Sequence, residues 1–277
     1  MSPGHDKKDR VFQAVRAACR PGGAPRRAGG RSRAAIGLAL ALGAAPLALA
    51  QAPASPGSVA PQALQAGTMA ARLAACTACH GESGAGSADG YFPRIAGKPA
   101  EYLYNQLVNF RDGRRQYRPM QTLLANQSDD YLHAMAQWFA GQQPAYPAMR
   151  GAPAAAAARR GQTLALHGDA ALGVPACTAC HGATLSGVLP ASPGLVGLPH
   201  DYIAAQFGAW RIGNRRAHAP DCMGEIARRL APEDVAAVAA WLSSQPPAQA
   251  GPPEPAVRAP LPMRCGSQPN PGTAGAR

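Results

Sequence analysis

This chain contains Cys76-Thr77-Ala78-Cys79-His80-Gly81 and, later, Cys177-Thr178-Ala179-Cys180-His181-Gly182, two copies of one hexapeptide. At the Cys-x-x-Cys-His spacing, two thiols on one helical turn can attach covalently to a haem, and the next imidazole can bind its iron. The repeat therefore predicts two covalently attached haem c groups. The residues expected to hold them are Cys76, Cys79 and His80 for haem 1, and Cys177, Cys180 and His181 for haem 2.

Two other uses of paired cysteines fit the spacing less well. The Cys-x-x-Cys pairs of a four-thiolate zinc site are usually about 20 positions apart or fewer, whereas Cys79 and Cys177 are 98 positions apart. A thioredoxin-type redox pair needs a βαβ setting, and the flanks here are alanine-rich without a strand pattern. The haem interpretation is therefore preferred.

The first 50 residues resemble an export signal. Arginines precede the apolar run 34–50, and Ala48-Leu49-Ala50 ends this run in the small-x-small form of a cleavage site. We expect cleavage after Ala50 and a periplasmic mature protein. The alternative is an uncleaved membrane anchor, although a run of 17 residues lies at the lower limit for spanning a bilayer.

The basic composition belongs largely to this leader. The formal net charge is +12, and residues 1–50 hold nine of the 27 Lys and Arg residues but two of the 15 Asp and Glu residues. The rest of the chain is near +5 before the acidic propionates of two haems are counted. The charge therefore does not indicate a nucleic-acid partner.

The sequence after each motif runs in the same order. Residues 193–197 and 202–215 match 93–97 and 102–115 at an offset of 100, and beyond them an offset of 103 pairs Met120 with Met223. This duplication predicts two small domains, at 67–142 and 159–245, each packed around its haem because so short a chain buries little core of its own.

Helical periodicity and composition predict an all-α protein with non-helical connections. Apolar residues recur at helical spacing in 68–79, 102–113 and 132–139. Stretches rich in proline, alanine and small polar residues predict three segments outside the folded domains. These are a flexible lead-in at 51–66, a linker at 143–158 and a disordered tail at 246–277.

The ligand opposite each motif histidine decides whether a haem passes electrons or also binds a substrate. In the first copy, Met120 is the one soft or imidazole side chain between residues 81 and 132, and His133 on the following helix is the alternative. In the second copy, repeat alignment selects Met223. The competing ligands there are His200, His218 and Cys222.

Other residues are expected to support these sites. A backbone carbonyl at Pro93 or Pro193 can accept the Nδ1 proton of the motif histidine. Cys222 and Cys265 either form a disulfide that fixes the tail or remain free thiols. Four arginines at equivalent places either offset propionate charge or form a solvated face. They are Arg111, Arg115, Arg211 and Arg215.

Together, these residues resemble the di-haem cytochrome c4 family over roughly residues 68–245. The resemblance is carried by the tandem motifs, the turn 92–97, the Tyr-Leu-x-x-Gln-Leu helix continuing through 110–115, and the paired methionines. It implies two class I cytochrome c domains related by approximate twofold symmetry, with the haem propionate edges facing. It also implies the ligand sets Cys76, Cys79, His80 and Met120 for haem 1, and Cys177, Cys180, His181 and Met223 for haem 2. Cys222 and the long tail depart from the family pattern.

The resemblance implies a periplasmic electron carrier, not an enzyme, either soluble or associated with the membrane surface. Its expected donor is a quinol-oxidising complex and its expected acceptor a terminal oxidase, with outer-sphere transfer through the haem edges. One alternative is the cytochrome subunit of a periplasmic dehydrogenase, such as a flavocytochrome that oxidises sulfide. Another is a di-haem enzyme. Such an enzyme would either oxidise thiosulfate, a reaction to which a Cys222 thiolate would be suited, or reduce peroxide.

Overall fold

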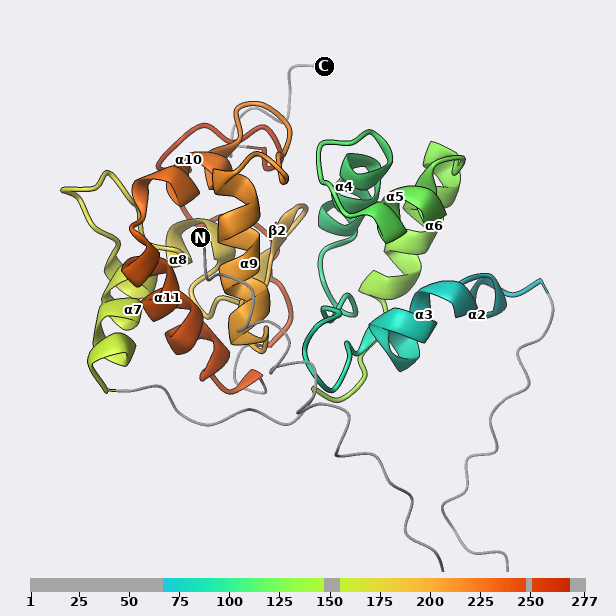
Figure 1. The fold of residues 1–277 in the computed structure, drawn as a ribbon, viewed down its shortest axis with the longest axis horizontal. Coiled ribbons are helices and arrows are strands. Elements are labelled where there is room, and N and C mark those ends of the chain that lie inside the picture. Colours follow the sequence, from blue (N-terminus) through green and yellow to red (C-terminus); the bar gives the residue numbers. More distant parts are fainter. Residues whose placement is uncertain (1–66, 147–154, 248–250, 270–277) are drawn as a thin grey trace, which may run out of the picture. The chain divides into compact units, whose positions relative to one another are not determined.

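The computed structural model describes residues 67–146, 155–247 and 251–269 (Figure 1). The expected leader at 1–50 and lead-in at 51–66 lie outside these ranges. In the first copy the helices are α2 (Met69–Arg72), α3 (Ala74–His80), α4 (Ala100–Arg111), α5 (Arg118–Leu124) and α6 (Asp129–Ala140). In the second copy they are α7 (Ala155–His167), α8 (Thr178–His181), α9 (His200–Arg211), α10 (Cys222–Arg229) and α11 (Pro232–Ser243).

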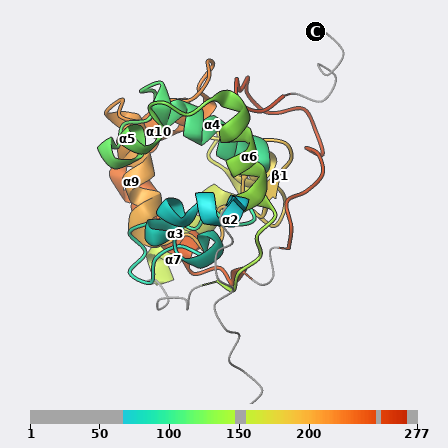
Figure 2. The same ribbon diagram turned by 90° about the vertical axis from the view of Figure 1, so that its right-hand side faces the viewer.

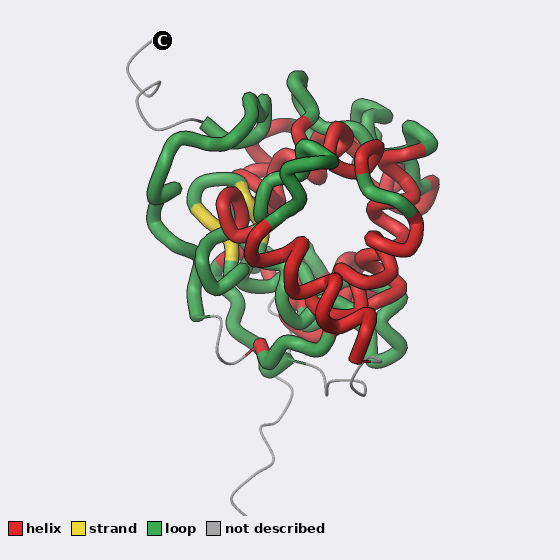
Figure 3. The backbone as a smooth tube through the Cα atoms, turned by 90° about the vertical axis from the view of Figure 1, so that its left-hand side faces the viewer, coloured by secondary structure: helices red, strands yellow, loops and turns green. Residues whose placement is uncertain are grey.

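The described chain is almost entirely helix and loop, so the all-α prediction is confirmed (Figure 3). The exceptions are a 3₁₀ turn at Glu82–Gly84 and a short antiparallel hairpin of β1 (Gly187–Val188) and β2 (Ser192–Pro193). In the described ranges, no helix combines the length and the hydropathy that a bilayer-spanning segment needs.

The first copy packs α4 against α6 (Figure 2). Helix α6 begins after Ser128, whose side chain accepts a hydrogen bond from the Tyr131 backbone N–H at 3.3 Å, and two aspartates occupy its first turn. Both features stabilise a helix N-terminus. Four side chains then recur on one face and enter the core. They are Leu132, Met135, Ala136 and Phe139.

The second copy has a core of its own, built where α7 crosses α11 (Figure 1). The two helices approach closely because Gly161 faces α11 without a side chain. Helix α7 begins at Ala155, inside the segment 143–158 that was expected to be a linker. An alanine-rich sequence is compatible with a helix as well as with a linker, and packing against α11 stabilises the helix.

Substituting Gly161→Ala will destabilise the second copy by about 2–3 kcal/mol, because overpacking a close helix contact costs about this much. A Cβ at this position would overlap the carbonyl oxygen of Ala237 and lie 2.7 Å from Cβ of Trp241. Chemical denaturation followed by circular dichroism measures the change. The matched control is Gly208→Ala in α9, where no heavy atom lies within 4 Å of the added carbon. The control will be neutral or stabilising by a few tenths of a kcal/mol to ~1 kcal/mol, and an equal loss in both variants would contradict the packing argument.

The duplicated chain pairs with itself through equivalent loops. The Gln116 N–H donates to the Asn214 carbonyl at 2.7 Å, and the Arg216 N–H donates to the Arg114 carbonyl, also at 2.7 Å. These bonds flank an antiparallel bridge between Arg115 and Arg215. Because each partner contacts its own counterpart, the pairing has the reciprocal form of a twofold contact.

Residues 251–269, which we call the C-terminal strap, are hydrogen-bonded to the second copy. The Glu254 N–H donates to the Gly187 carbonyl at 2.9 Å, and the Leu189 N–H donates to the Glu254 carbonyl at 2.8 Å. The Glu254 carboxylate also accepts a bond from the Ala183 N–H at 2.6 Å. The strap thus extends the edge of the β1–β2 hairpin.

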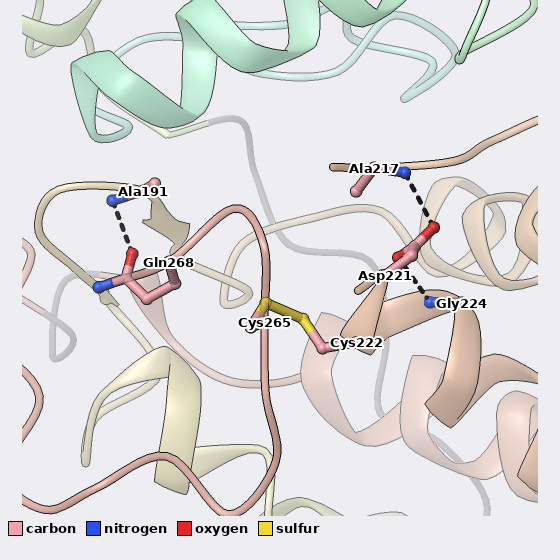
Figure 4. Close-up of a disulfide and its surroundings, with 7 residues drawn as sticks. All are labelled: Ala191, Ala217, Asp221, Cys222, Gly224, Cys265 and Gln268. Atoms are coloured by element: carbon pink, nitrogen blue, oxygen red, sulfur yellow. Dashed lines mark hydrogen bonds between the residues drawn. A yellow bond between two sulfur atoms is a disulfide. The ribbon is translucent and has the colours of Figure 1, made fainter. Parts of the chain in front are cut away.

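The strap corrects the expectation of a disordered tail for its own residues. Of the two alternatives for Cys222 and Cys265, the disulfide is the one that forms, and it joins the strap to the start of α10 (Figure 4). Beyond it, the Gln268 side chain accepts a bond from the Ala191 N–H and donates one to the Leu189 carbonyl, both at 2.9 Å. Proline-rich sequence lacks helix and strand signals, but its polar groups are satisfied here by another part of the fold.

Candidate haem sites

Each motif histidine ends a helix: α3 contains the whole first motif, and α8 begins directly after Cys177, its N-cap residue. None of the four motif cysteines forms a disulfide, so all four thiols are available for thioether bonds. Burial raises the pKa of Cys76 and Cys180, and raises that of Cys177 to about 11. Nucleophilic redox cysteines have lowered pKa values, so the environment argues against a thioredoxin-type pair.

The two motif histidines are buried and oriented alike. His80 Nδ1 donates to the Pro93 carbonyl at 2.9 Å, and His181 Nδ1 donates to the Pro193 carbonyl at 2.8 Å. Burial, the largest cause, lowers the pKa of both imidazoles, so they are neutral near pH 7. With Nδ1 protonated, the Nε2 lone pair is free to bind iron. The predicted hydrogen bonds to the two proline carbonyls are confirmed.

A cavity of about 160 Å³ opens beside His181. Since about 15 Å³ holds one water molecule, this space suits a large ligand and exceeds a packing defect. Its lining includes Cys177, Cys180 and apolar side chains from α9 and α11, and strap residues such as Leu261 and Met263 close part of it. A flat, largely apolar macrocycle bound to both cysteines fits these walls.

One orphaned polar atom in this cavity also fits a haem. Trp210 lines the cavity, and its buried indole Nε1–H has no hydrogen-bond partner among the described residues. A buried donor of this kind is costly unless an acceptor is supplied. A haem propionate is such an acceptor. Sequence analysis aligned Trp210 with Phe110 but did not recognise that only the tryptophan can donate a hydrogen bond.

The lining of the cavity distinguishes between the four candidate ligands of haem 2. Met223 and Cys222 line it, whereas His200 and His218 do not. Cys222 is bonded to Cys265, so it offers no thiolate to iron. Met223 is therefore the candidate that the geometry favours, and its ligation stays a prediction.

Asp221 fixes the turn that presents Met223. Its carboxylate accepts hydrogen bonds from the Ala217 N–H at 2.8 Å and from the Gly224 N–H at 2.9 Å (Figure 4). The second bond caps the N-terminus of α10. The methionine thus lies between this cap and the disulfide at its neighbour Cys222, which together restrain the backbone on both sides.

In the first copy, the two candidate ligands lie in different environments. Met120, in α5, packs against the buried cluster around Leu132. His133 stacks on the Tyr104 ring, with 3.5 Å between ring centroids, and its side chain is 41% exposed beside Glu101. This position faces solvent, so Met120 remains the predicted ligand of haem 1.

Two arginines at the contact between the copies lack acidic partners. Arg215 is buried, and in the described part of the chain neither it nor Arg115 forms an ion pair with a carboxylate. Their hydrogen bonds go to neutral side chains of both copies, namely Gln106, Gln206, Tyr102 and Tyr202. Burial lowers the pKa of Arg215. A buried cation is stabilised by a compensating anion, and haem propionates would supply one.

The four predicted arginines therefore divide into two kinds. Arg211 is exposed and donates to the Leu230 carbonyl at 3.4 Å. Arg111 pairs with Asp112 and Asp129 at the surface, at 3.0 and 2.6 Å, which is the solvated arrangement. Arg115 and Arg215 occupy the protected cluster just described. A further cation that sequence analysis did not single out, Lys98, also lines the second cavity.

Comparison with known proteins identifies the family. The cytochrome c family model matches residues 65–143, which contain the first motif. The thiosulfate dehydrogenase electron acceptor of Thiomonas intermedia (strain K12) is 40% identical over 174 residues, covering 62% of this chain and 79% of that protein. The cytochrome c4 of Pseudomonas aeruginosa is 34% identical over 174 residues, covering 62% of this chain and 84% of that protein.

Solved structures agree with these relatives. Thiosulfate dehydrogenase (TsdBA) from Marichromatium purpuratum has a TM-score of 0.56 at 32% identity, and the match covers 62% of this chain but 37% of that chain. Reduced recombinant cytochrome c4 from Pseudomonas stutzeri has a TM-score of 0.55 at 31% identity, covering 63% of this chain and 95% of that chain. The chain therefore belongs to the di-haem cytochrome c4 family, and it is an electron carrier of two tandem class I cytochrome c domains with covalently bound haem c.

Proposed function

We propose that this carrier accepts electrons from a periplasmic dehydrogenase that oxidises thiosulfate and passes them to a terminal oxidase. The observation that carries the proposal is the 40% identity over 174 residues to a protein named as a thiosulfate dehydrogenase electron acceptor. A second protein of that name, from Stutzerimonas stutzeri (strain A1501), is 39% identical over 171 residues. This function is close to one alternative from the sequence, in which the chain serves a periplasmic dehydrogenase as its cytochrome subunit.

The geometry supports a carrier in preference to an enzyme with its own substrate site. We propose that Met120 and Met223 close the positions opposite His80 and His181, which would leave neither iron with a free site. An enzyme using a thiolate beside haem 2 would need Cys222 as a free thiol, but this residue is bonded to Cys265.

The residues of this chain hold and shield the redox groups. When bound, each haem supplies a one-electron Fe(III)/Fe(II) couple. The carbonyls of Pro93 and Pro193 fix the planes of the two imidazoles, and thioether ligands raise the potentials. The apolar lining of the second cavity excludes water, and Arg115 and Arg215 would offset the charge of the propionates.

A second candidate donor is a quinol-oxidising complex, as the sequence first suggested. It is favoured by the similarity to proteins named cytochrome c4, one of them 34% identical over 182 residues. Both functions share the proposed export with cleavage after Ala50 and the proposed domains at 67–142 and 159–245. They differ only in which partner delivers the electrons.

A stopped-flow experiment on the oxidised holoprotein tests the proposal. The carrier is mixed with thiosulfate and a purified thiosulfate dehydrogenase, and haem absorption is recorded. We expect rapid reduction of both haems and no reduction when either thiosulfate or dehydrogenase is omitted. Reduction by thiosulfate alone would indicate that the chain is itself an enzyme. Reduction by a quinol-oxidising complex but not by the dehydrogenase would establish the second candidate instead.

A further inference from the structure

Lys98 belongs to the first copy but lines the haem cavity of the second. It lies in the turn just before α4, and its Nζ donates a hydrogen bond to the Gly194 carbonyl at 2.9 Å. Gly194 directly follows Pro193, whose carbonyl accepts the Nδ1 proton of His181 at 2.8 Å. The ammonium group is therefore next to the turn that holds the proximal ligand of haem 2.

The charge on Lys98 has no acidic partner in the part of the chain that the structure describes. Within the described ranges, no carboxylate pairs with its Nζ, and the charged neighbour that acts on it is another cation, Arg94. Burial, followed by this repulsion, lowers the pKa of Lys98 to about 8. The side chain is thus still mostly protonated at neutral pH, and because it is only partly exposed, its charge is incompletely screened by water.

The electric field of this charge reaches the haem ligand. Lys98 lowers the pKa of His181, as a smaller cause after burial and in opposition to the hydrogen bond from His181 to Pro193. The same field would act on an iron held by His181. A nearby cation opposes the oxidised, more positive state of a haem and so favours the reduced state.

The second copy has no lysine at the position that is equivalent to Lys98. Repeat alignment at an offset of 100 places Leu198 where the first copy has Lys98, and Leu198 is a buried apolar side chain. The charge acting on His80 comes from Arg115, which belongs to the reciprocal arginine cluster. Among the described residues of the first copy that line the second cavity, Lys98 is the one with a charged side chain.

We propose that Lys98 is a positioning residue that raises the reduction potential of haem 2 from the neighbouring domain. It acts through the turn that holds His181 and touches neither a substrate nor a partner. As a result, haem 2 has its full potential only while the first domain is docked. The proposal rests on the di-haem carrier itself and not on the identity of the electron donor.

Potentiometric titration of the holoprotein with optical detection tests this role. Lys98→Gln retains a hydrogen-bond donor without the charge, and we expect it to lower the haem 2 potential by about 59 mV, a tenfold change in the one-electron equilibrium. Lys98→Leu, which copies residue 198, will lower it at least as far. Lys98→Arg will keep most of the wild-type potential. The potential of haem 1 will change far less in all three variants.

Two controls assign the effect. Arg159→Gln removes an exposed charge from α7 of the second copy, and we expect no resolved shift because water screens that charge. Met223→Ala identifies which of the two potentials belongs to haem 2. Equal shifts of both haems, no shift in either neutral Lys98 variant, or a shift in Lys98→Leu without one in Lys98→Gln would each overturn the proposal.

A second measurement needs no substitution. Lys98 is the only lysine after Lys8 in the sequence, so a chain cleaved after Ala50 and labelled with ¹⁵N-lysine gives one ammonium signal. We expect this signal to shift in the reduction step assigned to haem 2. A signal that follows haem 1 instead, or that is unchanged through both steps, would overturn the placement of Lys98.

Discussion

Replacing Met223 with alanine will remove about half of the methionine-to-ferric charge-transfer absorption, and replacing Met120 will remove the other half, because each haem is expected to have one thioether ligand. Each variant will also lower the potential of its own haem by on the order of 0.1 V or more, since axial ligands tune haem potentials over about 0.8 V. Visible spectra and potentiometric titration of the oxidised holoproteins measure both effects.

The control for these variants is Met135→Leu. Met135 is a buried core methionine of the first copy, 4% exposed, and leucine replaces it with similar volume. The charge-transfer band will keep its full intensity in this variant. A full band in Met223→Ala would show that another side chain binds haem 2, with His218 the first to examine. A full band in Met120→Ala would point in the same way to His133.

The double substitution Cys222→Ser with Cys265→Ser will destabilise the second domain by about 4 kcal/mol. The disulfide closes a loop between residues 43 apart, and the chain-entropy model gives about this value for such a loop. Guanidinium denaturation of the holoprotein, followed by circular dichroism, measures the loss. The shift will appear in the transition of the second domain, while the first domain keeps its midpoint.

A pair of alanines provides the matched control for the serines. Cys222→Ala with Cys265→Ala removes the same crosslink without adding hydroxyl groups, so an equal loss in both double variants assigns the effect to the crosslink. If neither variant shifts the midpoint, the hydrogen bonds of Glu254 and Gln268 hold the strap by themselves. A loss confined to the serine variant would indicate a cost of burying hydroxyls.

Local sequence was sufficient for the parts of this protein that depend on short spacing. The Cys-x-x-Cys-His motifs, the helix at 102–113 and the helix at 132–139 can each be recognised within about four helical turns, where side-chain periodicity is set by the helix itself. The hydrogen bonds of His80 and His181 also followed, because the prolines that accept them occupy equivalent places in a visible repeat.

The rest depended on contacts between distant segments. The strap has neither helical nor strand periodicity, and its order comes from bonds to residues such as Gly187 and Ala191, far earlier in the chain. No pattern in the sequence singles out Lys98, and only the fold places it in the cavity of the other copy. The expected single helix at 68–79 is instead divided at Leu73, which is completely buried. Tertiary packing overrides local propensity in each case.

The strap also brings a disulfide into the wall of a cavity that is lined by two reduced thiols. Leu261, Met263 and Gln268 form part of the wall around the second cavity, and Cys265 is bonded to the residue beside the predicted ligand Met223. Oxidation of Cys222 and Cys265 before haem attachment would close that wall over an empty cavity. The same oxidation would threaten Cys177 and Cys180, which must stay reduced to form thioethers. Among the described residues, one cysteine pair is thus oxidised while the four motif thiols stay reduced, so the two kinds of cysteine need opposite redox chemistry in one chain.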